Sequence, residues 1–410
     1  WATHGEPNQA NAHPQYSADQ RFYLVHNGVI ENYKDLKAEY LSDVQFKSQT
    51  DTEVIVQLVD KFVTAYEMDT KAALLKVLRL ISRDSSYAFA LMDREQPDTL
   101  YVAKNKSPLL VGIGQGYNMV GSDAISMLKQ TNEFMEIEDH ELVIVKPDHV
   151  TIESFTNEEK HRDTFTVDMA PDAADKGAYP FYMLKEIDEQ PAVMRRLVQE
   201  YLGADGHPQI DTELLAQMKA ADHLYIIGAG TSYHAGLIGA RLFERLAQVP
   251  TTVHISSEFA YEQPLLSDNP FFIFLSQSGE TADSREVLVH VNENHWPSLT
   301  ITNVDKSTLS REATHTLLLY AGPEIAVAST KAYTAQVAVQ AAQSFDIKDE
   351  LAKVANGMQA LVDSKEEIEA IAANALAKPR NAFYIGRGID WAVSLEAALK
   401  LKEISYVQAE

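Results

Sequence analysis

The stretch Phe271-Phe-Ile-Phe-Leu-Ser-Gln-Ser-Gly-Glu-Thr281 decides how the rest of the chain is interpreted. Its first five residues are apolar and partly aromatic, as in a strand that is buried on both faces. Hydroxyl and amide side chains and Gly279 then indicate a tight loop, and a helical pattern begins at Ala282. The unpaired N–H groups of a first helical turn favour an anion. Because Ser276–Thr281 contains no Lys or Arg, these residues predict a neutral phosphate site, although an ordinary capped turn would use the same residue types.

Further apolar runs alternate with helical patterns on both sides of this stretch. Such alternation is typical of a parallel, doubly wound sheet, in which ligands bind at the carboxyl ends of the strands. The loops Gly228–Ser232 and Gly322–Thr330 both follow expected strands, so we expect them near the phosphate loop. Tyr233 stands where a dinucleotide-binding loop would have its third glycine, which disfavours a nucleotide. The other expected strands are Leu224–Gly228, Thr251–Ile255, Ser298–Thr302 and Thr316–Tyr320.

The first 155 residues have a different pattern, with helices before many short strands. Thr50-Asp-Thr-Glu53 is typical of a helix start, and a second helix is expected over Lys71–Ile81. Asn27-Gly28 predicts a tight turn after a strand, and an Asn beside a Gly N–H can also form an oxyanion hole. We therefore expect an antiparallel sheet layered with helices. Its expected strands are Phe22–Val25, Tyr87–Met92, Leu100–Ala103, Leu109–Ile113, Met119–Gly121, Leu142–Val145 and Val150–Phe155.

The composition limits the possible functions. A chain of 410 residues predicts two or three domains. The net charge of −24 argues against nucleic acid or an anionic membrane as a partner, and no apolar run is long enough to span a membrane. A cytoplasmic location is expected. The chain contains no Cys, which excludes disulfides and a Cys nucleophile within these residues. The 13 His residues are scattered and are interpreted as surface or core side chains, so we expect no metal and no organic cofactor.

The last segment repeats the design of Leu224–Gly230. Ala382–Asp390 is again interpreted as an apolar strand followed by Gly-x-Gly and a helix, which suggests a duplicated domain. On that helix Glu396, Lys400 and Glu403 are spaced by four and three residues, so they share one face. Two interpretations remain open: a stabilising ladder of ion pairs, or acid–base groups for moving a proton between adjacent carbons.

Four short motifs resemble the class II (N-terminal nucleophile) glutamine amidotransferase domain. They are Trp1-Ala-Thr-His-Gly5, Asn11-Ala-His-Pro14, His26-Asn-Gly-Val-Ile-Glu-Asn32 and Thr50-Asp-Thr-Glu53. The resemblance implies that Asn27 and Gly28 form the oxyanion hole and that Asp51 binds the α-amino group of glutamine. The other residues that it assigns to glutamine are Thr3, His4 and Gly28, with Trp1 as the gate of an ammonia channel.

The second half resembles the sugar isomerase (SIS) domain, whose signature Leu-Ser-x-Ser-Gly-Glu-Thr is intact at Leu275–Thr281. By resemblance the phosphate of fructose 6-phosphate is bound by Ser276, Gln277, Ser278 and Thr281. The sugar is contacted by Ser232, Val327 and Ser329. Leu395–Ser405 is similar to the family's isomerase-site helix, which assigns Glu403 as the base and Lys400 as the ring-opening partner.

Together these motifs resemble the glutamine–fructose-6-phosphate aminotransferase family. The implied fold class is α/β: a partial α-β-β-α sandwich of the N-terminal-nucleophile type, followed by two SIS-type doubly wound domains, the second partial. Expected boundaries are 1–156 for the amidotransferase domain, 157–184 for a linker, and 185–345 and 346–410 for the SIS domains. The implied partners are glutamine, fructose 6-phosphate and a second copy in a homodimer. The implied reaction is the amination and isomerisation of fructose 6-phosphate to glucosamine 6-phosphate.

The sequence departs from the family pattern in three places. The family's nucleophilic Cys and the Arg before Trp1 are absent, so we expect no glutaminase activity from these 410 residues. The family's catalytic His and Schiff-base Lys would lie beyond Glu410, and a loop is expected to be missing near Ser344–Ile347. Two rivals are a sugar-phosphate-binding regulator and a glutamine-independent isomerase or deglycase, and the oxyanion motif argues against both.

Overall fold

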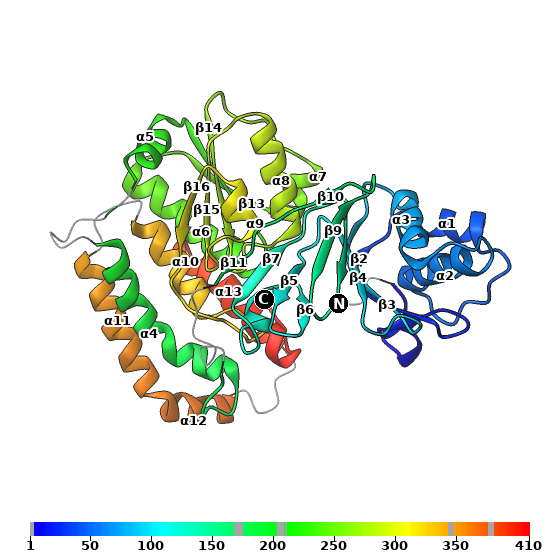
Figure 1. Ribbon diagram of the computed structural model, residues 1–410. Coiled ribbons are helices and arrows are strands. Elements are labelled where there is room, and N and C mark those ends of the chain that lie inside the picture. Colours follow the sequence, from blue (N-terminus) through cyan, green and yellow to red (C-terminus); the bar gives the residue numbers. More distant parts are fainter. Residues whose placement is uncertain (1–3, 168–174, 203–208, 210, 343–347, 376–380) are drawn as a thin grey trace. The chain divides into compact units, whose positions relative to one another are not determined.

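The computed structural model describes residues 4–167, 175–202, 209, 211–342, 348–375 and 381–410. The chain divides into two compact units, Trp1–Asp172 (unit 1) and Ala173–Glu410 (unit 2), which are described separately below (Figure 1). Within the described ranges, every helix is too short or too polar to cross a lipid bilayer.

Unit 1 consists of two antiparallel sheets and a layer of helices (Figure 1). The strand order is β1-β2-β3-β4-β8-β9-β10 in the larger sheet and β11-β7-β5-β6 in the smaller one. The larger sheet contains β1 (Gln15–Tyr16), β2 (Phe22–Val29), β3 (Ser86–Asp93), β4 (Leu100–Asn105), β8 (Glu141–Val145), β9 (Val150–Ser154) and β10 (Glu159–Lys160). The smaller sheet contains β5 (Leu110–Ile113), β6 (Asn118–Gly121), β7 (Glu133–Glu136) and β11 (Phe165–Thr166). The helices are α1 (Tyr33–Tyr40), α2 (Asp51–Thr64) and α3 (Thr70–Leu80), with 3₁₀ turns η1 (Gln9–Asn11) and η2 (Ile125–Met127).

Two separate cores give unit 1 its layers. Phe62 of α2 and Phe22 of β2 belong to the core between the helices and the larger sheet. Val102 of β4 and Val111 of β5 belong to a second core, which lies between the two sheets. The order helix, sheet, sheet confirms the expected antiparallel sheet covered by helices.

The helix start predicted at Thr50 is confirmed. The Thr50 hydroxyl accepts the Glu53 N–H (3.2 Å) and caps α2. The Glu53 carboxylate accepts N–H groups of Lys47 and Ser48 in the approach to the helix, so the motif also holds the preceding loop. The capped first turn therefore places Asp51 at the start of α2, where the N–H groups point outward.

The expected linker differs from the structure at its start. β10 pairs with β9, and β11 pairs with β7, so residues 159–166 extend both sheets of unit 1. Charged side chains such as Glu159 and Lys160 suggested a linker, but an exposed edge strand carries the same residue types. The sequence pattern could not separate these two cases.

Asp60 on α2 predicts a stabilising substitution. Burial, and then the nearby charge of Asp19, raises the pKa of Asp60 to about 6, and Asp60 Oδ1 is buried without a hydrogen-bond partner among the described residues. Because this pKa lies above the ordinary value, wild-type stability falls as the pH rises from about 4 through 6. We expect Asp60→Asn to raise the free energy of unfolding at pH 7.5 by about 1–2 kcal/mol, a figure reduced for partial exposure.

Urea unfolding at pH 7.5 and at pH 4 measures this effect, and the gain should shrink at the lower pH. Asp43→Asn is the matched control, because the pKa of Asp43 is lowered by a hydrogen bond from Lys61. The control should not stabilise the protein. An Asp60→Asn variant that is less stable than the wild type at pH 7.5 would contradict the prediction.

Unit 2 is built on a five-stranded parallel sheet with the order β13-β12-β14-β15-β16 (Figure 1). The strands are β12 (His223–Gly228), β13 (Thr251–Ile255), β14 (Pro270–Ser276), β15 (Ser298–Thr302) and β16 (His315–Leu318). The helices are α4 (Tyr182–Tyr201), α5 (Thr212–Ala220), α6 (Thr231–Leu242), α7 (Ser256–Tyr261), α8 (Ala282–Glu293), α9 (Thr308–Glu312), α10 (Lys331–Ala342), α11 (Lys348–Asp363), α12 (Lys365–Ala375) and α13 (Ile389–Ser405), with a π turn η4 (Phe243–Ala247) after α6. The predicted doubly wound sheet is confirmed, with strand limits shifted by up to two residues.

The central strand β14 explains the apolar run that predicted it. Phe271 and Ile273 belong to the core under α4, α6 and α10, whereas Phe272 and Phe274 belong to the core under α7, α8 and α9. Every residue of β14 is buried. A strand covered by helices on both faces has no polar alternation, which is why this run is continuously apolar.

The last segment packs differently from the expected second domain. Ala355 of α11 lies in the same core as α4, so residues beyond 345 complete the first sheet's packing. The expected strand from Ala382 is only β17 (Asn381–Ala382), which pairs in parallel with β18 (Gln408–Ala409) across α13. Phe383 and Ile385 lie outside β17 and are 73% and 94% exposed, so the expected apolar strand is wrong for them. A loop was expected to be missing near Ser344–Ile347, and these residues lie outside the described ranges.

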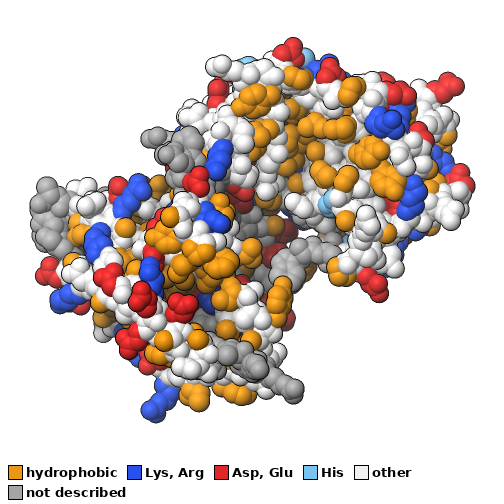
Figure 2. All heavy atoms as spheres, turned by 90° about the horizontal axis from the view of Figure 1, so that it is seen from below, with side chains coloured by type: hydrophobic (Ala, Val, Ile, Leu, Met, Phe, Trp, Pro, Cys, Tyr) orange, Lys and Arg blue, Asp and Glu red, His pale blue; other side chains and the backbone are white. Residues whose placement is uncertain are grey.

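The sequence contains more acidic than basic residues, 59 Asp and Glu against 35 Lys and Arg. On the face shown in Figure 2, the Lys and Arg side chains of the described residues are interspersed with acidic and apolar ones. This mixed arrangement differs from the continuous basic patch of a nucleic-acid-binding face.

Candidate functional site

Asp51 is the centre of the candidate site in unit 1. Its side chain is 3% exposed, although it is a carboxylate. One oxygen accepts the Ile30 N–H at 2.8 Å, and the other accepts the Thr52 N–H at 2.9 Å and lies 3.6 Å from His4 Nδ1. The carboxylate is therefore held at the start of α2, where the helix dipole favours a negative charge.

The turn predicted at Asn27-Gly28 is wrong. Both residues lie inside β2, where Asn27 is opposite Ala88 and Gly28 is opposite Tyr87 of β3. Gly28 has φ +133°, and a Cβ there would lie 2.0 Å from the Ser86 carbonyl oxygen. Glycine is needed here because the backbones of β2 and β3 approach closely. A glycine after an Asn is also typical of a turn, so the sequence pattern does not distinguish the two cases.

The structure brings part of the predicted glutamine set together. Gly28 is two residues before Ile30, whose N–H binds Asp51, and His4 lies beside the same carboxylate. Asn27 is exposed on β2. Trp1 and Thr3 fall outside the described residues.

Two histidines near Asp51, the buried His26 and the exposed His13, were not singled out from the sequence. His26 Nδ1 lies 3.0 Å from the Thr52 hydroxyl, and His13 Nε2 lies 3.4 Å from the same oxygen. Burial lowers the pKa of His26 to about 4, although the Asp51 charge acts in the opposite direction. His26 is therefore neutral near pH 7. The motifs that contain His13 and His26 were visible in the sequence. The contact of both side chains with Thr52 could not be predicted, because it depends on the packing of β2 against α2.

The candidate site in unit 2 lies where the strand order reverses. β12 and β14 are neighbours, yet the connections after them run to opposite sides of the pair, since β13 flanks β12 and β15 flanks β14. Ligands of such sheets bind at the carboxyl ends of these two strands. The loop Gly228–Gly230 and the loop Gln277–Thr281 occupy those two ends, as predicted from the sequence.

The predicted phosphate loop is braced by its own hydroxyls. Ser276 is buried, and its Oγ accepts the Gly279 N–H at 2.9 Å and lies 2.8 Å from the Thr281 hydroxyl. Gly279 has φ +69°, and a Cβ there would lie 1.9 Å from Ser307 Oγ. Gln277 and Ser278 are partly exposed. Ser276 and Thr281 thus hold the loop in shape, while Gln277 and Ser278 are accessible to solvent.

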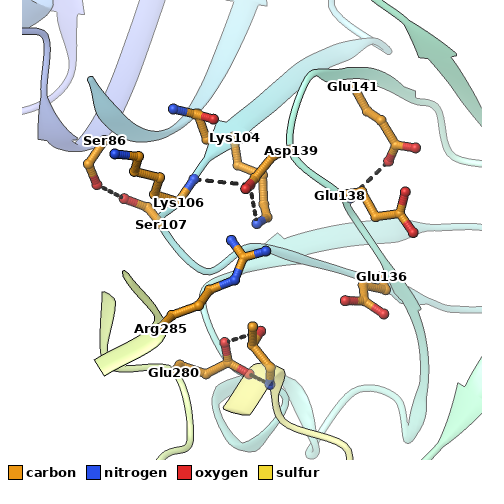
Figure 3. Close-up of polar contacts among 12 residues, drawn as sticks. Ser86, Lys104, Lys106, Ser107, Glu136, Glu138, Asp139, Glu141, Glu280 and Arg285 are labelled. Atoms are coloured by element: carbon orange, nitrogen blue, oxygen red, sulfur yellow. Dashed lines mark hydrogen bonds and ion pairs between the residues drawn. The ribbon is translucent and has the colours of Figure 1, made fainter. Parts of the chain in front are cut away.

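Glu280, within the same signature, has a role that the sequence did not indicate. Its carboxylate accepts the Thr308 N–H at 2.9 Å and the Thr308 hydroxyl at 2.7 Å, at the start of α9 (Figure 3). Asn303 N–H donates to the Gln277 carbonyl, and Asn303 Nδ2 donates to the Gly322 carbonyl. The loops after β14, β15 and β16 are therefore connected by hydrogen bonds.

Lys400 on α13, one of the two predicted acid–base residues, contacts Thr231 at this end of the sheet. Its Nζ lies 2.6 Å from Glu403 Oε2 and 3.3 Å from Glu396 Oε1, and donates to Thr231 Oγ1 at 2.8 Å. Glu396 is 5% exposed and also bonds His234 Nδ1 at 2.7 Å. The ladder of ion pairs is present, and its place beside Thr231 keeps the acid–base interpretation open as well.

The three predicted sugar contacts lie in two places. Ser232, in the first turn of α6, accepts a hydrogen bond from Gln336 Nε2 at 3.0 Å. Ser329 donates to Glu324 at 2.7 Å in the loop before α10, and the Val327 side chain is fully exposed in that loop. Within the described part of the chain, no group of three or more His, Asp and Glu side chains has the arrangement of a metal site.

Comparison with known proteins assigns both units. Residues 6–130 match the glutamine amidotransferase domain, and residues 217–342 match the SIS domain. The chain is similar in its whole length to glutamine–fructose-6-phosphate aminotransferase (isomerizing) of Lactiplantibacillus plantarum, with 67% identity over 70% of that protein. The enzyme of the same name from Staphylococcus epidermidis is 57% identical, again over 100% of this chain and 70% of the relative.

Among solved structures, the C-terminal domain of glucosamine-fructose-6-phosphate aminotransferase from Francisella tularensis is 35% identical. It covers 58% of this chain and 71% of that one, with a TM-score of 0.53. The matched domains contain Asn27, Gly28 and Asp51 in one case and the loops after β12 and β14 in the other. The chain therefore belongs to the glutamine–fructose-6-phosphate aminotransferase (isomerizing) family.

Proposed function

We propose that this protein transfers the amide nitrogen of glutamine to fructose 6-phosphate and isomerises the product to glucosamine 6-phosphate. This is the first step of the hexosamine pathway. The observation that carries the proposal is the presence, in one chain, of an amidotransferase unit with Asp51 buried at a helix start and a SIS unit with Lys400 and Glu403 beside Thr231. A sugar-phosphate sensor or a glutamine-independent isomerase has no use for the first unit.

Glutamine is proposed to bind in unit 1. Asp51 would hold the α-amino group, because its carboxylate is desolvated and oriented by two N–H groups. Asn27 and Gly28 would stabilise the oxyanion of the amide during its hydrolysis, for which the Cys nucleophile of the family is needed in addition to these 410 residues. The remaining proposed glutamine contacts are Trp1, Thr3 and His4.

Fructose 6-phosphate is proposed to bind in unit 2 at the reversal of strand order. Gln277 and Ser278 would contact the phosphate directly. Ser276 and Thr281 would hold the loop in the shape in which its backbone N–H groups donate to the phosphate. Ser232, Val327 and Ser329 would contact the sugar. The donors of the loop 276–281 carry no positive charge, which suits one phosphate rather than a pyrophosphate.

The proposed chemistry is acid–base catalysis on the open-chain sugar. Glu403 would move the proton between the first two carbons, which converts the ketose imine to the aldose amine. Lys400 lies between Glu403 and Thr231 and would serve ring opening by transferring a proton at the ring oxygen. No step of this scheme calls on a metal or an organic cofactor.

Domain limits, duplication, assembly and location are further parts of the proposal. The proposed limits are those of the two compact units, Trp1–Asp172 and Ala173–Glu410, because residues 159–166 extend the sheets of unit 1 and Ala355 packs in the core of the first parallel sheet. The duplication is supported by two Gly-x-Gly turns of equal shape: Gly230 has φ 53° and ψ −124°, and Gly388 has φ 61° and ψ −123°. Each turn opens a helix between two parallel strands. A homodimer in the cytoplasm follows from the resemblance to the family.

The reaction itself is tested by isotope transfer. The complete gene product is incubated with fructose 6-phosphate and glutamine labelled with ¹⁵N at the amide, and the products are analysed by mass spectrometry. The expected product is ¹⁵N-glucosamine 6-phosphate with an equal amount of glutamate. Absence of the labelled amino sugar, with both substrates unchanged, would disprove the proposed function.

A further inference from the structure

Glu186 of α4 is a buried carboxylate that none of the predicted roles uses. Its side chain is 1% exposed. Its Oε1 accepts two consecutive backbone N–H groups, from Ile325 at 2.6 Å and from Ala326 at 3.0 Å. These two residues lie 139 and 140 positions away in sequence, in the loop between β16 and α10. One buried oxygen thus binds the stretch that leads directly into Val327.

Keeping a carboxylate here is energetically costly. Burial raises the pKa of Glu186, and the two backbone N–H groups act against that rise by favouring the charged form. Glu186 Oε2 is buried without a hydrogen-bond partner in the described part of the chain. A carboxylate with one oxygen unsatisfied is a poor device for stability alone, since an apolar side chain of the same volume would avoid the desolvation penalty.

The same loop is held at its other end by a second carboxylate. Glu324 accepts the Thr330 N–H at 2.8 Å and the Ala332 N–H at 3.2 Å, and it also accepts the Ser329 hydroxyl at 2.7 Å. Residues 325–329 therefore run between two anchors, and we call them the anchored segment. Val327, in its middle, is fully exposed although its backbone neighbours are fixed.

The helix α4 makes one more contact beside this segment. Lys331, the first residue of α10, is 2% exposed, and its Nζ donates to Glu189 of α4 at 2.6 Å. Glu186 and Glu189 are one turn apart, so both bonds come from the same face of α4. The helix thereby fixes the anchored segment and the start of α10 as one rigid piece.

We propose that Glu186 is a positioning residue for sugar-phosphate binding, which holds the anchored segment in the conformation that presents Val327 and Ser329 to fructose 6-phosphate. This inference rests on the proposed function, which assigns those two residues to the sugar. Without the Glu186 bonds the segment samples other conformations. The observed dissociation constant of fructose 6-phosphate then equals the intrinsic constant divided by the fraction of protein that is in the binding conformation. Loss of such preorganisation weakens ground-state and transition-state binding equally, so KM changes while kcat does not.

The test compares three substitutions in the complete gene product. Glu186→Met removes both acceptors at nearly constant volume, and Glu186→Asp keeps the charge but shortens the reach by one methylene. Glu186→Gln keeps an amide oxygen at the same place. We expect the Met and Asp variants to raise the dissociation constant of fructose 6-phosphate in titration calorimetry, and its KM, by about tenfold. The kcat should stay within about threefold, and the Gln variant should recover most of the affinity.

Asp211→Ala is the matched control. Asp211 also accepts a backbone N–H, from Glu213 at 2.8 Å, but it caps α5, which leads into the amino end of β12 and away from the ligand loops. This control should lose stability and keep the affinity for fructose 6-phosphate. The KM for glutamine should be unchanged in every variant.

Three results would each overturn the inference: an unchanged dissociation constant in the Asp variant, a Gln variant no better than Met, or an equal loss of affinity in Asp211→Ala. The Asp variant decides the matter if the Met variant fails to fold. A failure of the proposed function is recognised separately, because the wild type would then bind fructose 6-phosphate without forming glucosamine 6-phosphate, or would not bind it at all. The second of these outcomes overturns both.

Discussion

Replacing Glu403 by Gln is expected to lower the kcat for glucosamine 6-phosphate by about 10²–10⁴-fold, because the amide cannot accept the proton that the proposed isomerisation moves. The amide keeps the shape of the side chain and can still accept a hydrogen bond from Lys400, which lies 2.6 Å from Glu403. Stability should change by less than about 1 kcal/mol, as is usual for a partly exposed ion pair. The measurement is steady-state formation of glucosamine 6-phosphate, together with the temperature of unfolding.

The control for this substitution is a second ion pair of the same spacing. Glu350 and Lys353 on α11 are also three residues apart and lie 2.7 Å from one another. Glu350→Gln should therefore have the same small effect on stability and leave turnover unchanged. If Glu403→Gln behaves like Glu350→Gln in both measurements, the pair on α13 is a structural ladder and the acid–base assignment is wrong.

Gly28→Ala is expected to destabilise the larger sheet of unit 1 by about 3 kcal/mol or more, enough to leave much of the protein unfolded or insoluble. The new Cβ would lie 2.0 Å from the Ser86 carbonyl oxygen and 2.8 Å from Tyr87 Cα, both of them backbone atoms that cannot rotate away. Relief requires β2 and β3 to separate along the stretch that also holds Asn27. Any protein that does fold should have lost the proposed oxyanion geometry.

Gly116→Ala separates this clash from the cost of positive φ alone. Gly116 lies in the same unit and has φ +79°, but a Cβ there would have no atom within 4 Å. We expect this control to cost only about 1–2 kcal/mol. Urea unfolding of both variants, with hydrogen exchange of the β2 and β3 amides, provides the comparison. Equal destabilisation by the two substitutions would show that the close approach of β2 and β3 is not the reason for glycine at position 28.

Features that depend on neighbours in the sequence could be predicted. The apolar run of β14, the cap at Thr50 and the helix start at Ala282 each follow from local periodicity or capping chemistry, and all three are present. The carboxyl-end location of the two ligand loops also followed, because strand–helix alternation leaves little choice of sheet type.

Features that depend on residues far apart in the sequence could not be predicted. Asn27-Gly28 has the residues of a turn, yet it lies in a strand, because it pairs with Ala88 and Tyr87 of β3, which are 61 and 59 positions later in the sequence. The residue pair alone does not contain that contact. Residues 159–166 were expected in a linker for the same reason, since edge strands are identified by what they pair with.

The sequence by itself determined the two kinds of chemistry in this protein, because amidotransferase and SIS motifs are short, local arrangements of donors, carboxylates and glycines. Only the tertiary structure decided which of these groups serve the loops and which face a ligand. Ser276 and Thr281 bond to one another, Glu280 binds α9, and Glu186 reaches the anchored segment from another helix. The physical reason is that a hydroxyl or carboxylate has the same composition in either role, and its partner is set by the folded chain, at a separation of 5 residues for Ser276 and 139 for Glu186.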